Sequence, residues 1–365
     1  MSYKYPVYQP NLNGNEKKYV QECLDSTWIS SKGKFIKQFE DNFSDFIRIK
    51  NAIAVSNGTV ALHIALLALG IGRDDEVIVP TFTYIASVNS ISYTGAKPIF
   101  VDSDPHTWQI DPKEIERYIS KKTKAIMAVH IYGHPCEMIE IRKIADKHKL
   151  LIIEDCAEGI GTFFNGKHVG LFGDISTFSF FGNKSITTGE GGMVCTNDDK
   201  LAELSSRLKG QGLAKNREYF HDIIGYNYRM TNICAAIGCA QLERANDILN
   251  KKKQVAVNYI NGIKSIPLTY HKEIGDVKHS YWMFSILVNS ESERTKLRKY
   301  LNESGIETRP TFHPVHAMPM YNTGEKFEVA EDLGSRGINL PSYPDLSESD
   351  IKYITNKINS FYNGS

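Results

Sequence analysis

The clearest reactive group in the sequence is Lys184, which ends the stretch Ser179–Lys184 (SFFGNK). A lysine set among aromatic residues and glycines is partly removed from water, which favours the neutral amine and frees it as a nucleophile. Taken alone, however, a lysine is more often a solvated surface charge. The following glycine-rich run, Thr187–Gly192, fits neither the Walker pattern nor a strand-following G-x-G-x-x-G. A nucleotide triphosphatase and a classical dehydrogenase are therefore disfavoured.

Two adjacent carboxylates, Glu154 and Asp155, close the apolar run Leu150–Ile153. Acidic residues at the end of a buried strand are costly unless they are paired, so we expect at least one to meet a cation or a metal. A metal site needs further carboxylates or histidines nearby, and the local sequence supplies only Glu158. We therefore expect no metal site.

Two further stretches follow predicted strands and carry groups that suit a phosphorylated aromatic ligand. Gly58, in Ser56-Asn57-Gly58-Thr59, permits close approach of the backbone, and the N–H groups of a helix N-terminus favour a phosphate. An ordinary helix cap explains this stretch equally well. Tyr84, in Pro80–Tyr84, could stack on a flat ring, although core packing is the more common role of such an aromatic residue.

A fifth stretch, Gly225–Thr231, precedes a long helical segment. Thr231 fits a helix cap, but that role does not explain Asn227 or Arg229.

Together, a phosphate cradle, a stacking aromatic residue, a buried carboxylate and a desolvated lysine are what pyridoxal phosphate requires. The lysine forms a Schiff base with this cofactor, and the carboxylate keeps the pyridine nitrogen protonated so that the ring accepts electrons. Four such features in chain order are more specific than any one of them. The sequence therefore predicts pyridoxal phosphate as the cofactor.

The elements that must position these groups alternate between short β-branched runs and helix-like segments from about residue 51 to 196. This alternation predicts an α/β fold with a largely parallel sheet covered on both faces. The five stretches fall where loops leave the carboxyl ends of strands, which is where such sheets bind ligands. The predicted strands are Ala52–Val55, Glu76–Val79, Pro98–Val101, Ala125–Val129, Leu150–Glu154, Ile175–Phe180 and Met193–Thr196.

The remaining pattern predicts helices and a second domain. At roughly 150 residues per domain, 365 residues predict two domains, which we place at 1–240 and 241–365. A strand is predicted at Tyr281–Val288. Helical segments are predicted at Asn13–Leu24, Lys34–Phe46, Val60–Leu69, Pro135–His148, Asp198–Gly210, Thr231–Gly262, Ser292–Glu303 and Ser347–Tyr362.

Composition excludes several classes of partner. Lys and Arg number 43 against 42 Asp and Glu, a net charge of +1 that gives no general attraction for nucleic acid or anionic membranes. The N-terminus lacks a signal-type apolar core, and no apolar run reaches the length of a membrane span. The six cysteines form no C-x-x-C and indicate free thiols in a reducing compartment. We therefore expect a soluble, cytoplasmic protein.

Over essentially its whole length, the chain resembles the DegT/DnrJ/StrS family of pyridoxal-phosphate sugar-nucleotide aminotransferases. The resemblance implies the fold-type I aminotransferase architecture, in which a large domain with a seven-stranded, mostly parallel sheet precedes a smaller α+β C-terminal domain. The motifs that carry it are Thr27–Gly33, Ser56–Thr59, Pro80–Tyr84, Glu154-Asp155, Ser179–Lys184 and Gly225–Met230.

The resemblance implies roles for these residues. Lys184 would bind the cofactor covalently and then carry a proton, Asp155 would pair with the pyridine nitrogen, and Tyr84 would lie against the ring. Many relatives carry His or Gln where this chain has Glu158. A hydrogen bond from Glu158 to the phenolic oxygen is then in question, because two anions repel unless one is protonated.

The phosphate and the substrate are implied to be held from both subunits of a homodimer, which could further assemble into a tetramer. Gly58, Thr59 and Ser179 would hold the phosphate, and Asn227 would reach it from the neighbouring subunit. The implied substrate-binding candidates are Trp28, Ser30, Arg229 and His313.

The implied reaction moves an amino group from L-glutamate, which leaves as 2-oxoglutarate, to the keto carbon of a nucleotide-linked 4-keto-6-deoxy sugar. The stretch Pro80–Gln109 favours GDP-4-keto-6-deoxy-D-mannose, and the product would feed surface polysaccharides such as the lipopolysaccharide O-antigen. Alternatives are a UDP- or dTDP-linked sugar, a free amino acid as acceptor, or a non-catalytic binding protein on the same fold. Lys184 argues against the family's sugar 3-dehydratases, which carry histidine at that position.

Overall fold

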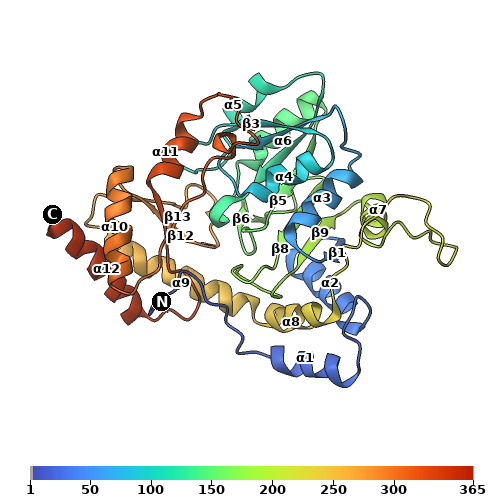
Figure 1. The fold of residues 1–365 in the computed structure, drawn as a ribbon, viewed down its shortest axis with the longest axis horizontal. Helices are drawn as coiled ribbons and strands as arrows, with labels where there is room; N and C mark the ends of the chain where they lie inside the picture. Colours follow the sequence, from blue (N-terminus) through green and yellow to red (C-terminus); the bar gives the residue numbers. More distant parts are fainter. Residues whose placement is uncertain (1–2, 365) are drawn as a thin grey trace.

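A seven-stranded sheet in the order β1-β9-β8-β5-β4-β2-β3 lies at the centre of the computed structural model, which describes residues 3–364 (Figure 1). Strand β9 runs antiparallel to its neighbours β1 and β8, whereas the other neighbouring strands are parallel. The predicted α/β fold with a mostly parallel seven-stranded sheet is confirmed. The strands are β1 (Asn51–Val55), β2 (Glu76–Pro80), β3 (Lys97–Val101), β4 (Thr123–Val129), β5 (Leu151–Asp155), β8 (Ile175–Ser179) and β9 (Gly192–Thr196).

Both faces of this sheet are buried, as its apolar strands require. On β4, Met127 and Val129 pack with helices α3 (Gly58–Ala68), α4 (Ile85–Tyr93) and α7 (Asp199–Lys209). Ile126 and Ala128, which point the other way, pack with α6 (Met138–His148). Towards β1 and β9, this second face is covered by α2 (Lys34–Ile47) and α8 (Asn232–Glu243), with α1 (Glu16–Asp25) packed against α8.

The long helical stretch predicted over Thr231–Gly262 is divided into two helices, α8 and α9 (Ala245–Ile263). Arg244 separates them with φ −115° and ψ 9°, and its guanidinium donates a hydrogen bond to Asn11 at 2.8 Å. Hydrophobic periodicity does not mark a break of one residue, because both helices keep an apolar face. Among residues 3–364, no helix combines the length and the apolar character that crossing a bilayer requires.

A second sheet, in the order β10-β12-β14-β13, organises the C-terminal part. Its core also includes Tyr5, which pairs with Ile306. The predicted domain division at 240 and 241 stays a prediction. The elements are β10 (Thr269–Tyr270), β12 (Phe284–Leu287), β13 (Arg309–Pro310), β14 (Gly337–Leu340), α10 (Glu291–Glu303), α11 (Glu328–Arg336) and α12 (Glu348–Asn363).

A third, small sheet in the order β11-β6-β7 joins a hairpin of the large domain to a strand of the C-terminal part. The short elements not yet named are α5 (Pro112–Ile115), β6 (Phe163–Phe164), β7 (Lys167–His168), β11 (Val277–Lys278) and the 3-10 turns Glu116–Tyr118, Ile131–Gly133 and Val315–Ala317.

Helix α2 is fixed to the sheet by Phe43, which is fully buried and meets Phe178 and Phe180 edge to face, with ring centres 5.0 and 5.3 Å apart. We expect Phe43→Ala to lower the free energy of unfolding by about 3–5 kcal/mol, because it removes a large core side chain and leaves a cavity. Lys37→Ala, on the exposed face of the same helix, should change it by less than about 0.5 kcal/mol. Urea titration of both variants checks this, and equal losses would contradict it.

Candidate active site

One cavity of about 680 Å³ lies at the carboxyl ends of the parallel strands. Every predicted cofactor residue except Asn227 lines it. Residues from the C-terminal sheet close its other side. The lining includes Gly58, Thr59, Tyr84, Ser87, Asp155, Glu158, Ser179, Lys184, Trp282, Arg309, Phe312 and Asn339.

Lys184 is held in this cavity by groups from distant parts of the chain. Its side chain is 12% exposed, and its Nζ lies 4.0 Å from the centre of the Trp282 ring and 3.4 Å from Glu158 Oε1. The Tyr8 hydroxyl donates a hydrogen bond to the Lys184 carbonyl oxygen. The alternative of a solvated surface lysine therefore fails.

Asp155 ends strand β5 and faces the cavity with a buried carboxylate. Its Oδ2 accepts a hydrogen bond from the Ser87 hydroxyl at 2.7 Å, and its Oδ1 accepts one from the Ala157 N–H at 3.0 Å. A carboxylate oxygen can accept two hydrogen bonds, so each oxygen keeps room for a donor in the cavity.

Glu154 is fully buried and satisfied within the protein. Its Oε2 accepts hydrogen bonds from His130 Nε2 (3.0 Å) and Gly170 N (2.7 Å), and its Oε1 accepts them from Phe172 N (2.7 Å) and Gly173 N (2.6 Å). Burial alone raises the pKa of Glu154, but these donors hold the pKa below its ordinary value. The expected cation is therefore not found at Glu154, because the Nδ1 of His130 accepts the Cys136 N–H at 3.0 Å and only its Nε2 donates.

These bonds also decide against a metal at the buried group of His130, Glu154 and Cys156, whose ligand atoms lie within 4.8 Å of one another. All the acceptor positions of Glu154 are occupied by N–H donors. Burial raises the pKa of the Cys156 thiol well above its ordinary value, which disfavours the thiolate that a metal needs.

Glu158 is buried with fewer donors than Glu154. Its Oε2 accepts a hydrogen bond from Tyr132 N at 2.6 Å, and its Oε1 faces the Lys184 amine. Burial raises the pKa of Glu158 to about 7, against the opposing effects of the Lys184 charge and the Tyr132 N–H. Near neutral pH this carboxyl is therefore partly protonated, which removes the repulsion that the sequence raised for a second anion beside it.

Helix α3 begins at the wall of the cavity, where Gly58 and Thr59 line it. Asn57 caps it by accepting the Val60 N–H at 3.0 Å, and the first N–H groups of a helix lack partners within the helix. A Cβ at Gly58 would lie 2.8 Å from the Cβ of Ser179, so glycine is required where β8 ends against the helix. Asn57 is therefore a helix cap, as the alternative expected, and the close contact with Ser179 explains Gly58.

Tyr84 precedes helix α4 and is 57% exposed, with its ring centre 5.5 Å from that of Phe312. The alternative of core packing therefore fails for Tyr84, whose ring is available to a ligand in the cavity.

Five predicted residues do not line the cavity that holds Lys184. Trp28 is 55% exposed and lines a separate hollow of about 700 Å³. Ser30, Asn227 and His313 are exposed. Arg229 is partly buried and donates a hydrogen bond from Nε to Ser31 Oγ at 3.1 Å. A single chain does not bring these residues to Lys184.

Several cavity residues gave no signal in the sequence, namely Tyr8 behind Lys184 and Ser87, Trp282, Arg309 and Asn339 in the lining. Trp282 lies in the predicted strand Tyr281–Val288, just before the observed β12, and Asn339 lies on β14, which was not predicted. Only the tertiary fold brings these two residues to the cavity. Arg309 is the cavity's arginine, and its guanidinium pairs with Glu307 at 3.2 Å.

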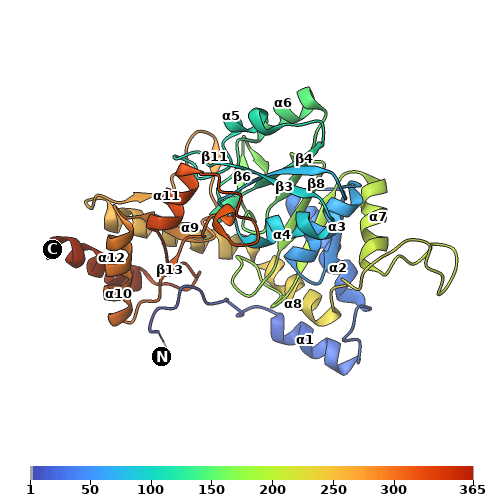
Figure 2. The same ribbon diagram turned by 45° about the horizontal axis from the view of Figure 1, so that its top comes forward.

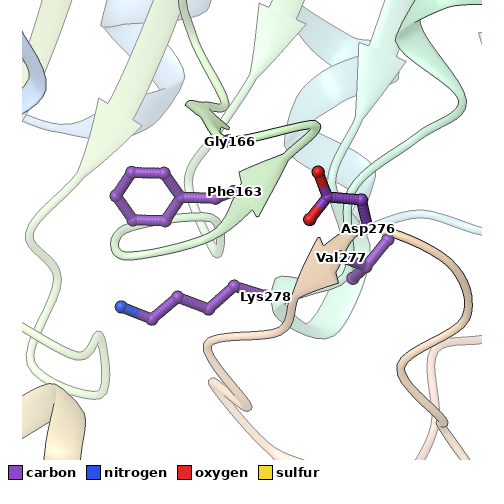
Figure 3. A pocket seen from close by; sticks show the side chains of 5 residues that line it. All are labelled: Phe163, Gly166, Asp276, Val277 and Lys278. Atoms are coloured by element: carbon purple, nitrogen blue, oxygen red, sulfur yellow. The ribbon is translucent and has the colours of Figure 1, made fainter.

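A smaller cavity of about 250 Å³ lies beside the third sheet, lined by Phe163, Gly166, Asp276, Val277 and Lys278 (Figure 3). The Lys278 amine lies 5.0 Å from the centre of the Phe163 ring, and the Asp276 carboxylate lies apart from that amine (Figure 3). This hollow does not gather groups for catalysis.

Comparison with known proteins finds matches along nearly the whole chain. The model of the DegT/DnrJ/EryC1/StrS aminotransferase family matches residues 10–359. The chain is 61% identical to GDP-perosamine synthase of Escherichia coli O157:H7 over 98% of each chain. It is 34% identical to EpsN of Bacillus subtilis, a putative pyridoxal phosphate-dependent aminotransferase, over 96% of this chain and 94% of the relative. A solved aminotransferase from Psychrobacter cryohalolentis matches 99% of both chains with a TM-score of 0.92 at 32% identity.

The pKa of Glu158 predicts a pH dependence of stability. A carboxyl whose pKa rises from 4.5 to about 7 on folding makes the protein lose stability as pH rises between these values, by up to about 3 kcal/mol. In protein stripped of bound small molecules, Glu158→Gln should not show this loss. Denaturant titrations at pH 5 and pH 8 check it. Glu140→Gln, at an exposed glutamate, should follow the wild type, and a Glu158→Gln curve parallel to the wild type would contradict the assignment.

Proposed function

Because the chain belongs to the DegT/DnrJ/EryC1/StrS aminotransferase family, we propose that its cavity binds pyridoxal phosphate and aminates a nucleotide-linked keto sugar. The specific reaction is transfer of the amino group of L-glutamate to C4 of GDP-4-keto-6-deoxy-D-mannose, which gives GDP-perosamine. The observation that carries the proposal is one cavity presenting the Lys184 amine, the Asp155 carboxylate and the N-terminus of α3. The name of the relative with 61% identity supports the choice of acceptor.

The residues of the cavity fit this cofactor. The N–H groups at Gly58 and Thr59, with the Ser179 hydroxyl, suit a phosphate at a helix N-terminus. Asp155 keeps acceptor positions open for a pyridine N–H, and the exposed Tyr84 ring can lie against the cofactor ring. Lys184 is the amine that would bind the cofactor covalently. When bound, the cofactor supplies an electron sink for the carbon that loses its proton.

The chain's own groups would then handle the protons. The Lys184 amine, once free, would take a proton from the substrate carbon and return one to it as a general base and acid. Asp155 would keep the proton on the pyridine nitrogen. Glu158, whose pKa lies near 7, would hold or release a proton beside the phenolic oxygen. Trp282 and Phe312 line the cavity with apolar surface that limits the access of water.

This proposal predicts glutamate-dependent amination with a preference for the GDP-linked ketone. We expect kcat/KM for GDP-4-keto-6-deoxymannose to exceed that for dTDP- and UDP-linked ketones by at least about tenfold, since polar groups built for one base are left unpaired by another. Lys184→Ala should fold and keep less than about a thousandth of the activity. Steady-state assays on protein free of host enzymes check both.

The two parts of this prediction can fail separately. A higher kcat/KM with a dTDP-linked ketone would overturn the choice of acceptor and leave the aminotransferase assignment intact. Substantial turnover by Lys184→Ala would overturn the role of Lys184. Amination of free keto acids without any nucleotide would favour an amino acid aminotransferase.

The site is further proposed to be shared between the subunits of a homodimer. Asn227 lies outside its own chain's cavity and pairs with Gly210 at the base of the segment between α7 and α8, the rest of which projects from the body of the molecule (Figure 1, Figure 2). This segment also exposes apolar side chains, with Tyr219 94% and Ile224 86% exposed. In a two-fold dimer, each such segment would enter the partner's cleft reciprocally.

All six cysteines are free, which supports the proposed cytoplasmic location.

Mixing two inactive variants tests the shared site. Asn227→Asp should be severely impaired, because a carboxylate would face the cofactor phosphate and repel it. In a mixed dimer with Lys184→Ala, one site carries both changes and the other carries neither. Random pairing makes half of the dimers mixed, so about a quarter of wild-type activity should return. Assays after subunit exchange check this.

Exchange has to be confirmed independently, for example by native mass spectrometry of differently tagged subunits. If Asn227 serves its own chain's site, every site stays damaged in the mixture. No recovery of activity after confirmed exchange would therefore contradict the shared site.

A further inference from the structure

Lys252 is a buried amine that the proposed reaction does not use. It lies on α9 and is 1% exposed. Its Nζ donates hydrogen bonds to the Ser342 carbonyl at 2.6 Å and to the Trp282 carbonyl at 3.1 Å. Within residues 3–364, no carboxylate forms an ion pair with it, so its partners are two backbone carbonyls and the face of an aromatic ring.

These two carbonyls lie where the ladder between β12 and β14 stops. Phe284 pairs with Leu340, and the antiparallel register continued by two residues sets Trp282 opposite Ser342. The Ser342 N–H, which stands opposite Trp282 in this register, donates to the Val7 carbonyl at 3.0 Å and so does not serve the Trp282 carbonyl. The Lys252 amine supplies the missing donors at this point, which matters because a buried carbonyl without a partner is costly.

Two contacts lead from Lys252 to the reactive lysine. The Trp282 ring covers the Lys184 amine at 4.0 Å, and its Nε1 donates to the Asn183 carbonyl at 2.8 Å. The Tyr8 ring centre lies 5.5 Å from the Lys252 Nζ, and the Tyr8 hydroxyl donates to the Lys184 carbonyl. Trp282 and Tyr8, which both contact Lys184, are thus also in contact with Lys252.

We propose that Lys252 is a positioning residue, which holds the backbone of Trp282 so that the indole ring stays against the Lys184 amine. This inference rests on the proposed function, in which Lys184 is the reactive group. It assigns a positioning role to an amine that does not line the cavity.

The two hydrogen bonds from the Lys252 amine to the carbonyls of Trp282 and Ser342 do not depend on its charge. Burial lowers its pKa to about 7, so both forms are present near neutral pH. A neutral amine still carries two N–H groups, one for each carbonyl. The variants that test the proposal must therefore change the donors and not only the charge.

The experiment measures how fast acetic anhydride labels Lys184, with mass spectrometry of the lysine-bearing peptide and the exposed Lys37 as internal reference. It is done on cofactor-free protein, so it does not require activity. Lys252→Met should speed labelling of Lys184 by about three- to fivefold, because loosening Trp282 removes the aromatic cover from the amine. Lys252→Arg, which keeps N–H donors on a long side chain, should recover a rate within about twofold of wild type.

Arg294→Met is the matched control. Arg294 is a buried cation of the C-terminal part that also donates to a backbone carbonyl, that of Gly334 at 2.7 Å, but it does not contact Trp282. Both variants should lose stability, and only Lys252→Met should change the labelling of Lys184. Equal effects of the two variants on labelling would overturn the proposal in favour of a general structural role.

A second variant covers the case in which Lys252→Met does not fold. Lys252→Gln keeps two N–H donors on a side chain too short to reach both carbonyls, and it should speed labelling by at least about twofold. In a protein that already carries Trp282→Phe, the Lys252 change should speed labelling of Lys184 little further, because both changes act on the contact between residue 282 and the Lys184 amine. An unchanged rate in a folded Lys252 variant, or full additivity with Trp282→Phe, overturns the proposal.

An amination assay of the wild-type holoenzyme, set beside the labelling rates, separates a failure of this inference from a failure of the proposed function. If Lys252→Met alters labelling while wild-type protein aminates no keto sugar, the positioning role stands and the proposed function fails. If the wild type is active and labelling does not change, the positioning role alone fails.

Discussion

The site depends on how a largely buried amine is held between two sheets. Lys184 lies in the loop between β8 and β9 of the large sheet, whereas the ring that covers it belongs to Trp282, two residues before β12 begins at Phe284. Removing a cation from water is costly unless a partner replaces the water, and here an aromatic face and the Glu158 carboxyl do so. The C-terminal sheet is therefore part of the active site, and the fold has to bring both sheets to one amine.

Most of the cofactor side of this site could be predicted because its residues lie in loops directly after strands. β-branched runs of four to six residues locate the strands, and a parallel sheet gathers their carboxyl ends at one edge. That geometry unites Gly58, Tyr84, Asp155, Ser179 and Lys184 although they are far apart in sequence. The family resemblance read from these motifs was confirmed by the match over residues 10–359.

The rest could not be read from local patterns. Arg309 belongs to the two-residue strand β13, and Trp282 lies just before the four-residue strand β12. The pairing of such short strands is decided by tertiary contacts. Asn227 carries a motif signal but lies outside its own chain's cavity, a position that no local pattern predicts. The break at Arg244 likewise leaves no mark on the apolar periodicity of α8 and α9.

Glu154 and Glu158 show how the surroundings of a buried glutamate can shift its pKa in opposite directions. Successive strand residues point to opposite faces, so only one of Glu154 and Asp155 can enter the cavity. Glu154 receives four N–H donors, which hold its pKa low and leave no position for a proton. Glu158 receives one backbone N–H and an amine, and burial raises its pKa to about 7. The number of donors around each buried glutamate therefore decides that Glu154 is structural and that Glu158 can exchange a proton.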